Sequence, residues 1–184
     1  MKKDKLRKQT IIDLQKLSEN PAAKQMLENK LHQKLFTSPE WKNAQTIGLT
    51  ISQQIEINTK PIITKAWSEG KAIVIPKTQK KPVMDFYQYE QNAPLQLTKY
   101  GLLEPIGNEK KIAPDSIDLL IVPGLIFHQK GYRIGFGGGF YDAYLAQFHG
   151  VTLSLAFPFQ LNSNWQPEIF DQPVDKIITN GVTL

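Results

Sequence analysis

The first third of the chain has apolar residues at the spacing of amphipathic helices. This spacing predicts a helix over residues 2–18. The Asn20-Pro21 pair supplies a cap and a first-turn proline for a second helix, which continues to about Phe36. The Ser38-Pro39 pair repeats this signal and predicts one further short turn of helix.

Beyond residue 45 the apolar pattern changes to that of β-strands. Short apolar or alternating runs predict strands at 46–51, 71–76, 83–89, 118–122, 151–157 and 176–179. Helices are expected from Thr59 to Gly70 and from about Phe140 to Phe148, whereas residues 90–116 are punctuated by Pro and Gly and are expected to be irregular.

This alternation of strands and helices favours an α/β fold, with an open, largely parallel sheet covered by helices on both faces. The architecture expected is a Rossmann-like three-layer sandwich. No internal repeat or linker divides the chain, so residues 1–184 are expected to form a single domain.

The composition is that of a globular domain, with 41% hydrophobic and 21% charged residues. No apolar run reaches the ~18 residues of a membrane-spanning helix, and the first twenty residues lack the apolar core of a signal peptide. The absence of Cys excludes disulfides, thiolate metal ligands and Cys nucleophiles. These features predict a cytoplasmic protein.

The formal charge of +5 is unevenly distributed. Residues 1–35 hold nine cations and four anions, so this segment accounts for the whole excess. Such a basic end is typical of proteins that bind nucleic acid, an anionic surface or a phosphorylated ligand, but a solvated helix face rich in Lys has the same composition. A nucleic-acid module is disfavoured because the cations are not interleaved with aromatic residues.

The segment Gly135–Gly139 contains four glycines in five residues. Glycine loses more backbone entropy on folding than other residues, so such a run needs a reason. One reason is a phosphate cradle, in which consecutive amides and the start of the next helix face an anion. The other is a strained connection between a strand and a helix, and the run by itself leaves both open.

Two common phosphate motifs do not match this loop. No Lys-Ser or Lys-Thr follows the glycines, which excludes the GxxxxGK[ST] motif. The loop does not directly follow a predicted strand, and no acidic residue lies about twenty positions further on, which argues against a dinucleotide fingerprint. The three His residues lack metal-ligand spacing.

The glycine loop is part of a longer ordered set of motifs. Besides Gly131–Asp142, the set comprises Lys3–Arg7, Glu56–Thr59, Gly101–Pro105, Val122–Phe127, Leu155–Phe157 and Asp171–Asp175. Together these segments closely resemble the signature of the 5-formyltetrahydrofolate cyclo-ligase (methenyltetrahydrofolate synthetase) family. The resemblance spans residues 3–175, nearly the whole chain.

The resemblance implies a ligase that uses ATP and Mg²⁺. It would cyclise 5-formyltetrahydrofolate, with or without a polyglutamate tail, to 5,10-methenyltetrahydrofolate and release ADP and phosphate. The implied protein is a monomer or weak homodimer that binds neither nucleic acid nor membranes. The alternative is a protein of the same fold that binds folate or a nucleotide without catalysis.

The resemblance also assigns site residues by position. The catalytic residues would be Arg133 and Tyr141, and the magnesium ligands would be Asp142 and Asp171. The expected ATP contacts are Lys3, Asp4, Lys5, Leu6, Arg7, Arg133, Ile134, Gly135, Phe136, Gly137, Gly138, Gly139, Phe140 and Tyr141. The expected folate contacts are Ile51, Glu56, Phe136, Gly137, Gly138, Gly139 and Phe140.

Several of these positions have simpler interpretations. Ile51 is equally explained as a core residue, Glu56 as a solvated strand-end carboxylate, and Asp171 as part of a turn. Phe140 departs from the family pattern, where a Tyr is common, and His128 replaces a commonly acidic residue. The lysines of residues 1–35 other than Lys3 are expected to be solvated.

Overall fold

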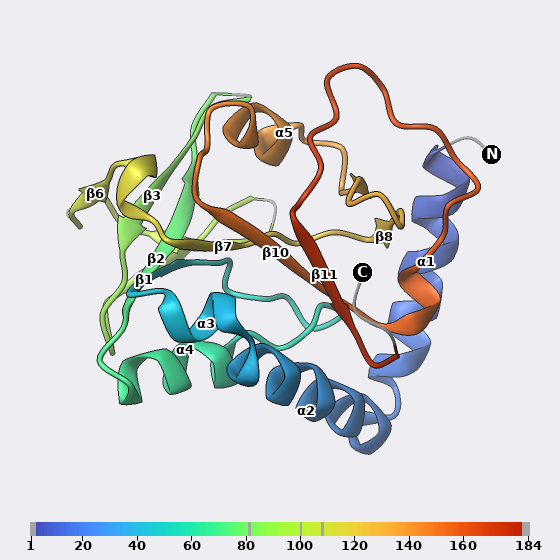
Figure 1. Cartoon of the computed structure of the whole chain (residues 1–184), viewed down its shortest axis with the longest axis horizontal. Helices are drawn as coiled ribbons and strands as arrows, with labels where there is room; N and C mark the ends of the chain where they lie inside the picture. The colour runs from blue at the N-terminus through green and yellow to red at the C-terminus, as the bar shows by residue number, and fades with distance from the viewer. Residues whose placement is uncertain (1–2, 81, 100, 108, 182–184) are drawn as a thin grey trace.

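The computed structural model describes residues 3–80, 82–99, 101–107 and 109–181. A seven-stranded sheet runs through it, with helices on both sides (Figure 1). The strand order is β11-β10-β7-β1-β2-β3-β6. In chain order these strands are β1 (Thr46–Gly48), β2 (Ala72–Thr78), β3 (Met84–Gln88), β6 (Lys111–Ile112), β7 (Leu119–Ile121), β10 (Val151–Ala156) and β11 (Lys176–Thr179).

The strands from β11 to β2 are all parallel, and β3 and β6 add an antiparallel edge. The central strand β1 pairs with β2 on one side and with β7 on the other. After β1, the chain first adds β2, β3 and β6 on one side of it and later adds β7, β10 and β11 on the other side. This change of direction creates a topological switch point between β1 and β7. Two hairpins lie outside the sheet: β4 (Leu95–Leu97) with β5 (Leu103–Pro105), and β8 (Ile126–Phe127) with β9 (Arg133–Ile134).

The α-helices that accompany the sheet in the described parts of the chain are α1 (Lys3–Ser18), α2 (Pro21–Thr37), α3 (Pro39–Asn43), α4 (Lys60–Ser68) and α5 (Phe140–Leu145). Short 3₁₀ turns occur at Pro114–Ser116 and Pro158–Gln160. The caps of α2 and α3 form as the sequence predicts, because the side chains of Asn20 and Ser38 accept hydrogen bonds from the amides of Ala23 (3.1 Å) and Trp41 (3.3 Å).

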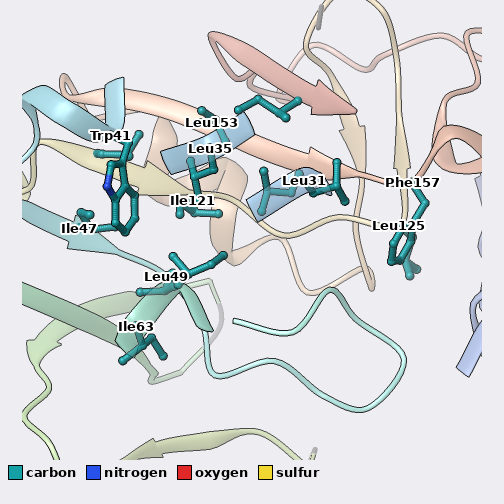
Figure 2. Close-up of a cluster of buried hydrophobic side chains, with 14 of the residues drawn as sticks. Leu31, Leu35, Trp41, Ile47, Leu49, Ile63, Ile121, Leu125, Leu153 and Phe157 are labelled. Atoms are coloured by element: carbon teal, nitrogen blue, oxygen red, sulfur yellow. The ribbon is translucent and has the colours of Figure 1, made fainter. Parts of the chain in front are cut away.

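The sheet separates two apolar clusters. Successive residues of a strand point to opposite faces, so Leu119 and Ile121 join the cluster covered by α1, α2 and α4, whereas Leu120 and Val122 join the cluster that includes α5. Figure 2 shows the first cluster, in which Leu31 and Leu35 of α2 lie against strand residues such as Leu153. The prediction of a largely parallel sheet with helices on both faces is confirmed.

Some local predictions are wrong. Residues 90–116, expected to be irregular, contain β4, β5, β6 and a 3₁₀ turn. The glycine loop was expected not to follow a strand directly, but it follows β9. Strands of two or three residues are too short to show an alternating pattern, so sequence periodicity does not detect them. The predicted helical position Lys2 lies outside the described residues.

In the described residues no helix combines the length and the apolar character that crossing a membrane requires.

Candidate functional site

A small cavity lies at the carboxyl ends of the central parallel strands. Its volume is about 50 Å³, and residues that follow β1 (Leu49, Thr50) and β7 (Pro123, Gly124) line it. This is the switch point of the sheet, where open α/β folds bind ligands because the connections diverge there and leave a crevice. The topology alone therefore selects this edge as the candidate site.

Glu56 supplies the acidic group of the cavity. It lies in the loop between β1 and α4, and its Oε2 accepts a hydrogen bond from the Gln53 amide at 2.6 Å. Burial raises the pKa of this carboxyl, while the Gln53 amide and the Lys24 ammonium oppose the rise. The interpretation of Glu56 as a solvated strand-end residue is therefore wrong.

The glycine loop has a backbone that other residues rarely adopt. Gly137 and Gly139 have φ of 93° and 73°, in the left-handed region. Gly139 also stands at the N-cap of α5, which has only six residues. Because α5 is so short, the loop's own amides are the more important anion-binding groups.

The amides of this loop are available to a ligand. Among the described residues, no group accepts a hydrogen bond from the backbone N–H groups of residues 135–139. Arg7 of α1 lies beside them, since its Nε donates to the Gly135 carbonyl at 2.8 Å and its guanidinium lies 3.9 Å from the position of a Cβ on Gly137. A row of free amides next to a cation is the arrangement that holds phosphate groups.

Lys3 joins the amino-terminal helix to the loop before β11. Its Nζ contacts Asp171 at 2.8 Å and Glu168 at 3.5 Å, and lies 5.5 Å from the centre of the Trp165 ring. Lys3 and Arg7 share one face of α1, as their spacing predicts, and this face points toward the glycine loop and the 165–172 loop.

Arg133 is buried, with 3% of its side chain exposed, and it braces the other side of the loop. Its NH1 donates to the Gln172 carbonyl at 2.7 Å and its NH2 to Asp142 Oδ1 at 3.0 Å. The same oxygen of Asp142 accepts the Gln172 amide at 3.1 Å. These bonds bring the chain around Asp171 next to Asp142, although the two acids are far apart in the sequence.

Tyr141 lies beside Arg133, whose guanidinium carbon is 5.9 Å from the centre of the tyrosine ring. Its hydroxyl is buried and has no hydrogen-bond partner among the residues that the structure describes. Burial raises the pKa of this hydroxyl, with the Glu56 charge adding to the rise and the Arg133 charge opposing it. The tyrosine is therefore protonated at neutral pH and can donate a hydrogen bond to a ligand, which would relieve its unsatisfied state.

The donor set fits a magnesium ion. Asp142 and Asp171 each use one carboxylate oxygen for their described partners, and the second oxygen of each accepts no hydrogen bond within the described parts of the chain. Those parts contain no group of three or more His, Cys, Asp or Glu residues that could hold a metal. Magnesium with a nucleotide needs only one or two carboxylates, because phosphates and water complete its shell.

The side chains of several other expected contacts lie either in the apolar core or in solvent. The side chains of Leu6 and Ile134 are in the apolar core, and Ile51 packs against it. Asp4 is exposed and pairs with Arg7. Lys5 is exposed, and Phe136 is the most exposed apolar residue of the glycine loop.

The sequence did not indicate Glu168, and it gave Gln172 no role although the Asp171–Asp175 motif contains it, whereas the structure places both residues at the site. Both lie in an irregular segment without periodicity, and only the fold brings them to Lys3 and Arg133.

Comparisons with known proteins identify the family of the chain. The model of the family described as 5-formyltetrahydrofolate cyclo-ligase matches residues 1–180. The chain belongs to the 5-formyltetrahydrofolate cyclo-ligase family.

Individual members of the cyclo-ligase family are similar to this chain in sequence and in structure. A probable 5-formyltetrahydrofolate cyclo-ligase of Schizosaccharomyces pombe is 34% identical over 157 residues, which cover 83% of this chain and 76% of that protein. The cyclo-ligase of Haemophilus influenzae is 29% identical over 180 residues, covering 94% and 96%. The solved structure of the Aquifex aeolicus 5,10-methenyltetrahydrofolate synthetase has a TM-score of 0.85 at 28% identity and covers 100% of this chain and 92% of its own. The predictions of the family and of a ligase are confirmed.

Proposed function

We propose that this chain is a 5-formyltetrahydrofolate cyclo-ligase that forms 5,10-methenyltetrahydrofolate from 5-formyltetrahydrofolate and ATP. The observation that carries the proposal is the row of unpaired amides at residues 135–139 beside Arg7, together with the cavity that Glu56 lines at the carboxyl ends of the strands. One half of this arrangement suits phosphate groups and the other a ring system with N–H donors. The two substrates of the reaction match the two halves, because ATP carries the phosphate groups and the folate carries the ring system with N–H donors.

ATP would place its phosphates against the glycine loop. Five consecutive amides can donate to phosphate oxygens, and Arg7 and Lys3 supply positive charge from α1. In the free protein these cations pair with Asp4 and Asp171, so binding exchanges carboxylate partners for phosphate. The exposed Phe136 would lie between the nucleotide and the folate.

The folate would enter the cavity with its pterin ring toward Glu56. A carboxylate can accept two N–H bonds from such a ring, which a neutral group cannot match. The cavity as described holds only about 50 Å³, so the loop around Glu56 must open for the ring to enter. Tyr141 would donate its hydrogen bond to a bound substrate.

In the reaction that follows, the formyl oxygen attacks the γ-phosphate and ADP leaves. The neighbouring N–H nitrogen of the folate then adds to the activated carbon, and the carbon–oxygen bond breaks to release phosphate, which carries away the proton lost by that nitrogen. An amide oxygen leaves poorly until it is phosphorylated, so the step needs positioning and charge neutralisation rather than a side-chain nucleophile. The loop amides, Arg7 and Lys3 provide these two effects.

Asp142 and Asp171 would hold the magnesium ion. When bound, the ion neutralises and orients the phosphate oxygens. Arg133 keeps Asp142 and the 171–172 segment together, so the two carboxylates stay adjacent.

The remaining expectations belong to the same proposal. The enzyme would act in the cytoplasm, as a monomer or weak homodimer, on folates with or without a polyglutamate tail. It would bind neither nucleic acid nor membranes.

The test is formation of the methenyl product, followed by its absorbance with purified protein, 5-formyltetrahydrofolate, Mg²⁺ and ATP. Product should form only when ATP is present. Folate binding without any product would contradict the proposal and support a non-catalytic binding protein.

A further inference from the structure

Two oppositely charged side chains are buried on the inner face of α2. Lys24 is 9% exposed and Glu28 is 6% exposed, and they pair at 2.5 Å across one helical turn. Charged residues are seldom so buried, because removing them from water is costly even when they pair. The expectation that these amino-terminal lysines are solvated is wrong for Lys24.

Both members of the pair also form hydrogen bonds to the backbone of one loop. Lys24 Nζ donates to the carbonyl of Glu56 at 2.7 Å, and Glu28 Oε1 accepts the amide of Asn58 at 2.9 Å. The backbone on both sides of Ile57 is therefore attached to α2.

The base of this loop is closed by a second set of bonds. Ser52 and Thr59 exchange hydrogen bonds between backbone amide and side-chain hydroxyl, at 3.0 Å in each direction. The Gln53 amide then holds the Glu56 carboxylate itself. With its ends and its carboxylate fixed locally, the loop is attached to α2 by Lys24 and Glu28, while the Ser18 hydroxyl of α1 donates a longer hydrogen bond, 3.4 Å, to the Gln54 carbonyl.

We propose that Lys24 and Glu28 are positioning residues that hold the 52–59 loop so that Glu56 faces the folate ring. This inference rests on the proposed function, in which Glu56 binds the substrate. The pair does not touch the substrate; it acts through the backbone of residues 56–58. The positive charge of Lys24 also favours the ionised form of Glu56, the form that accepts two N–H bonds.

If Lys24 served only stability, its removal would not change the KM for the folate specifically. Another buried lysine provides a matched control for this test. Lys71 is also a buried lysine, 8% exposed, whose Nζ donates to a backbone carbonyl, that of Ala44, at 2.7 Å. Lys71 and Ala44 precede β2 and β1, so they lie at the opposite edge of the sheet from the cavity.

The experiment compares Lys24→Met with Lys71→Met in the full-length protein. Both should lower the melting temperature, because each removes an ammonium that donates to a backbone carbonyl. Only Lys24→Met should raise the KM for 5-formyltetrahydrofolate, by about tenfold, the size of one lost hydrogen bond to a charged group. The KM for ATP should not change in either variant.

A second variant separates the effect of loop position on folate binding from the effect of the substitution on stability. Lys24→Met combined with Glu28→Gln leaves no unpaired buried charge, and glutamine still accepts the Asn58 amide, so the melting temperature should recover relative to Lys24→Met alone. The KM for the folate should stay raised, since nothing replaces the ammonium at the Glu56 carbonyl.

The inference is overturned if the folate KM returns to the wild-type value together with stability, or if Lys71→Met raises it as much as Lys24→Met. It is also overturned if Lys24→Met leaves it unchanged. In these cases the wild type still forms product, and the proposed function stands. A wild type that forms no methenyl product overturns the proposed function and this inference together.

Discussion

At the residue scale, burial of the Glu56 carboxylate lowers the stability of the protein, although the proposed function uses this group to bind the folate. Its carboxyl is largely removed from water, and one amide and one distant ammonium compensate only part of the loss. Burial therefore raises its pKa above the ordinary value of 4.5, so the protein loses stability as the pH rises through the raised pKa.

Glu56→Gln should make the protein more stable and weaken its binding of the folate. Glutamine keeps an acceptor for the Gln53 amide but carries no charge, so its melting temperature should exceed that of the wild type at pH 7. The difference should vanish below pH 4.5, where the wild-type carboxyl is also neutral. The KM for the folate should rise at least tenfold, as expected for loss of a charged acceptor.

Thermal unfolding at the two pH values and steady-state kinetics measure these effects. Glu19→Gln is the control, because Glu19 is exposed and should change neither property. A lower melting temperature of Glu56→Gln at pH 7 would contradict the argument.

Arg133→Ala should reduce turnover at least tenfold while the protein still folds. The change removes the brace between Asp142 and the Gln172 carbonyl, so only the Gln172 amide still links Asp142 to the segment of Asp171, and the two carboxylates are held less firmly. Single-turnover kinetics and circular dichroism check the two halves of this prediction. Unchanged kinetics would remove Arg133 from the site.

At the scale of elements, the glycine loop depends on a backbone that only glycine adopts easily. Gly137→Ala places a Cβ at a φ of 93° without a close contact, so its effect is backbone strain of about 1–2 kcal/mol. Because the strain alters the loop amides, the KM for ATP should rise clearly more than that for the folate.

Gly70→Ala is a matched control. Gly70 follows α4 with a φ of 72° and has open space around it, so the strain is similar but lies away from the site. Its kinetics should equal those of the wild type. Equal changes in the ATP KM of both variants would show that the effect is only one of stability.

The helix α1 should contribute to nucleotide binding through one face. Lys3→Ala combined with Arg7→Ala should mainly raise the KM for ATP, by at least tenfold, since it removes both cations beside the free amides. Lys8→Ala combined with Lys16→Ala removes the same charge from exposed positions of the helix and should have little effect. If ATP binding is untouched while stability falls, Lys3 and Arg7 serve the fold and not the site.

At the scale of the whole molecule, segments from both ends of the chain form one site. Lys3 and Asp171 are 168 positions apart and Arg7 and Gly135 are 128 apart, yet each pair is in direct contact. Such a site should behave as a unit when the nucleotide binds.

Magnesium with a non-hydrolysable ATP analogue should therefore protect residues 3–7, 133–142 and 168–172 together from hydrogen exchange. At a ligand concentration of a hundred times Kd, the melting temperature should rise by about 5–10 °C. Protection restricted to residues 135–139 would contradict a site shared by the three segments.

Much of this architecture follows from local sequence signals. Helices led by the Asn20-Pro21 and Ser38-Pro39 pairs begin where caps and prolines require, and the longer strands follow from their apolar runs. The glycine loop is also local, because the positive φ of Gly137 and Gly139 limits which residues can stand there. These features depend on backbone constraints within a few residues, and those constraints can be read from the sequence.

Other features arose only from tertiary structure. The sequence showed that Lys3 and Arg7 share a helix face, but not that this face meets Asp171 and Gly135. It predicted a solvated Lys24, whereas the structure buries Lys24 and Glu28 as an ion pair against the loop of Glu56. Burial and contacts between distant segments depend on how the elements pack across the sheet, and packing is a property of the whole chain that no local pattern encodes.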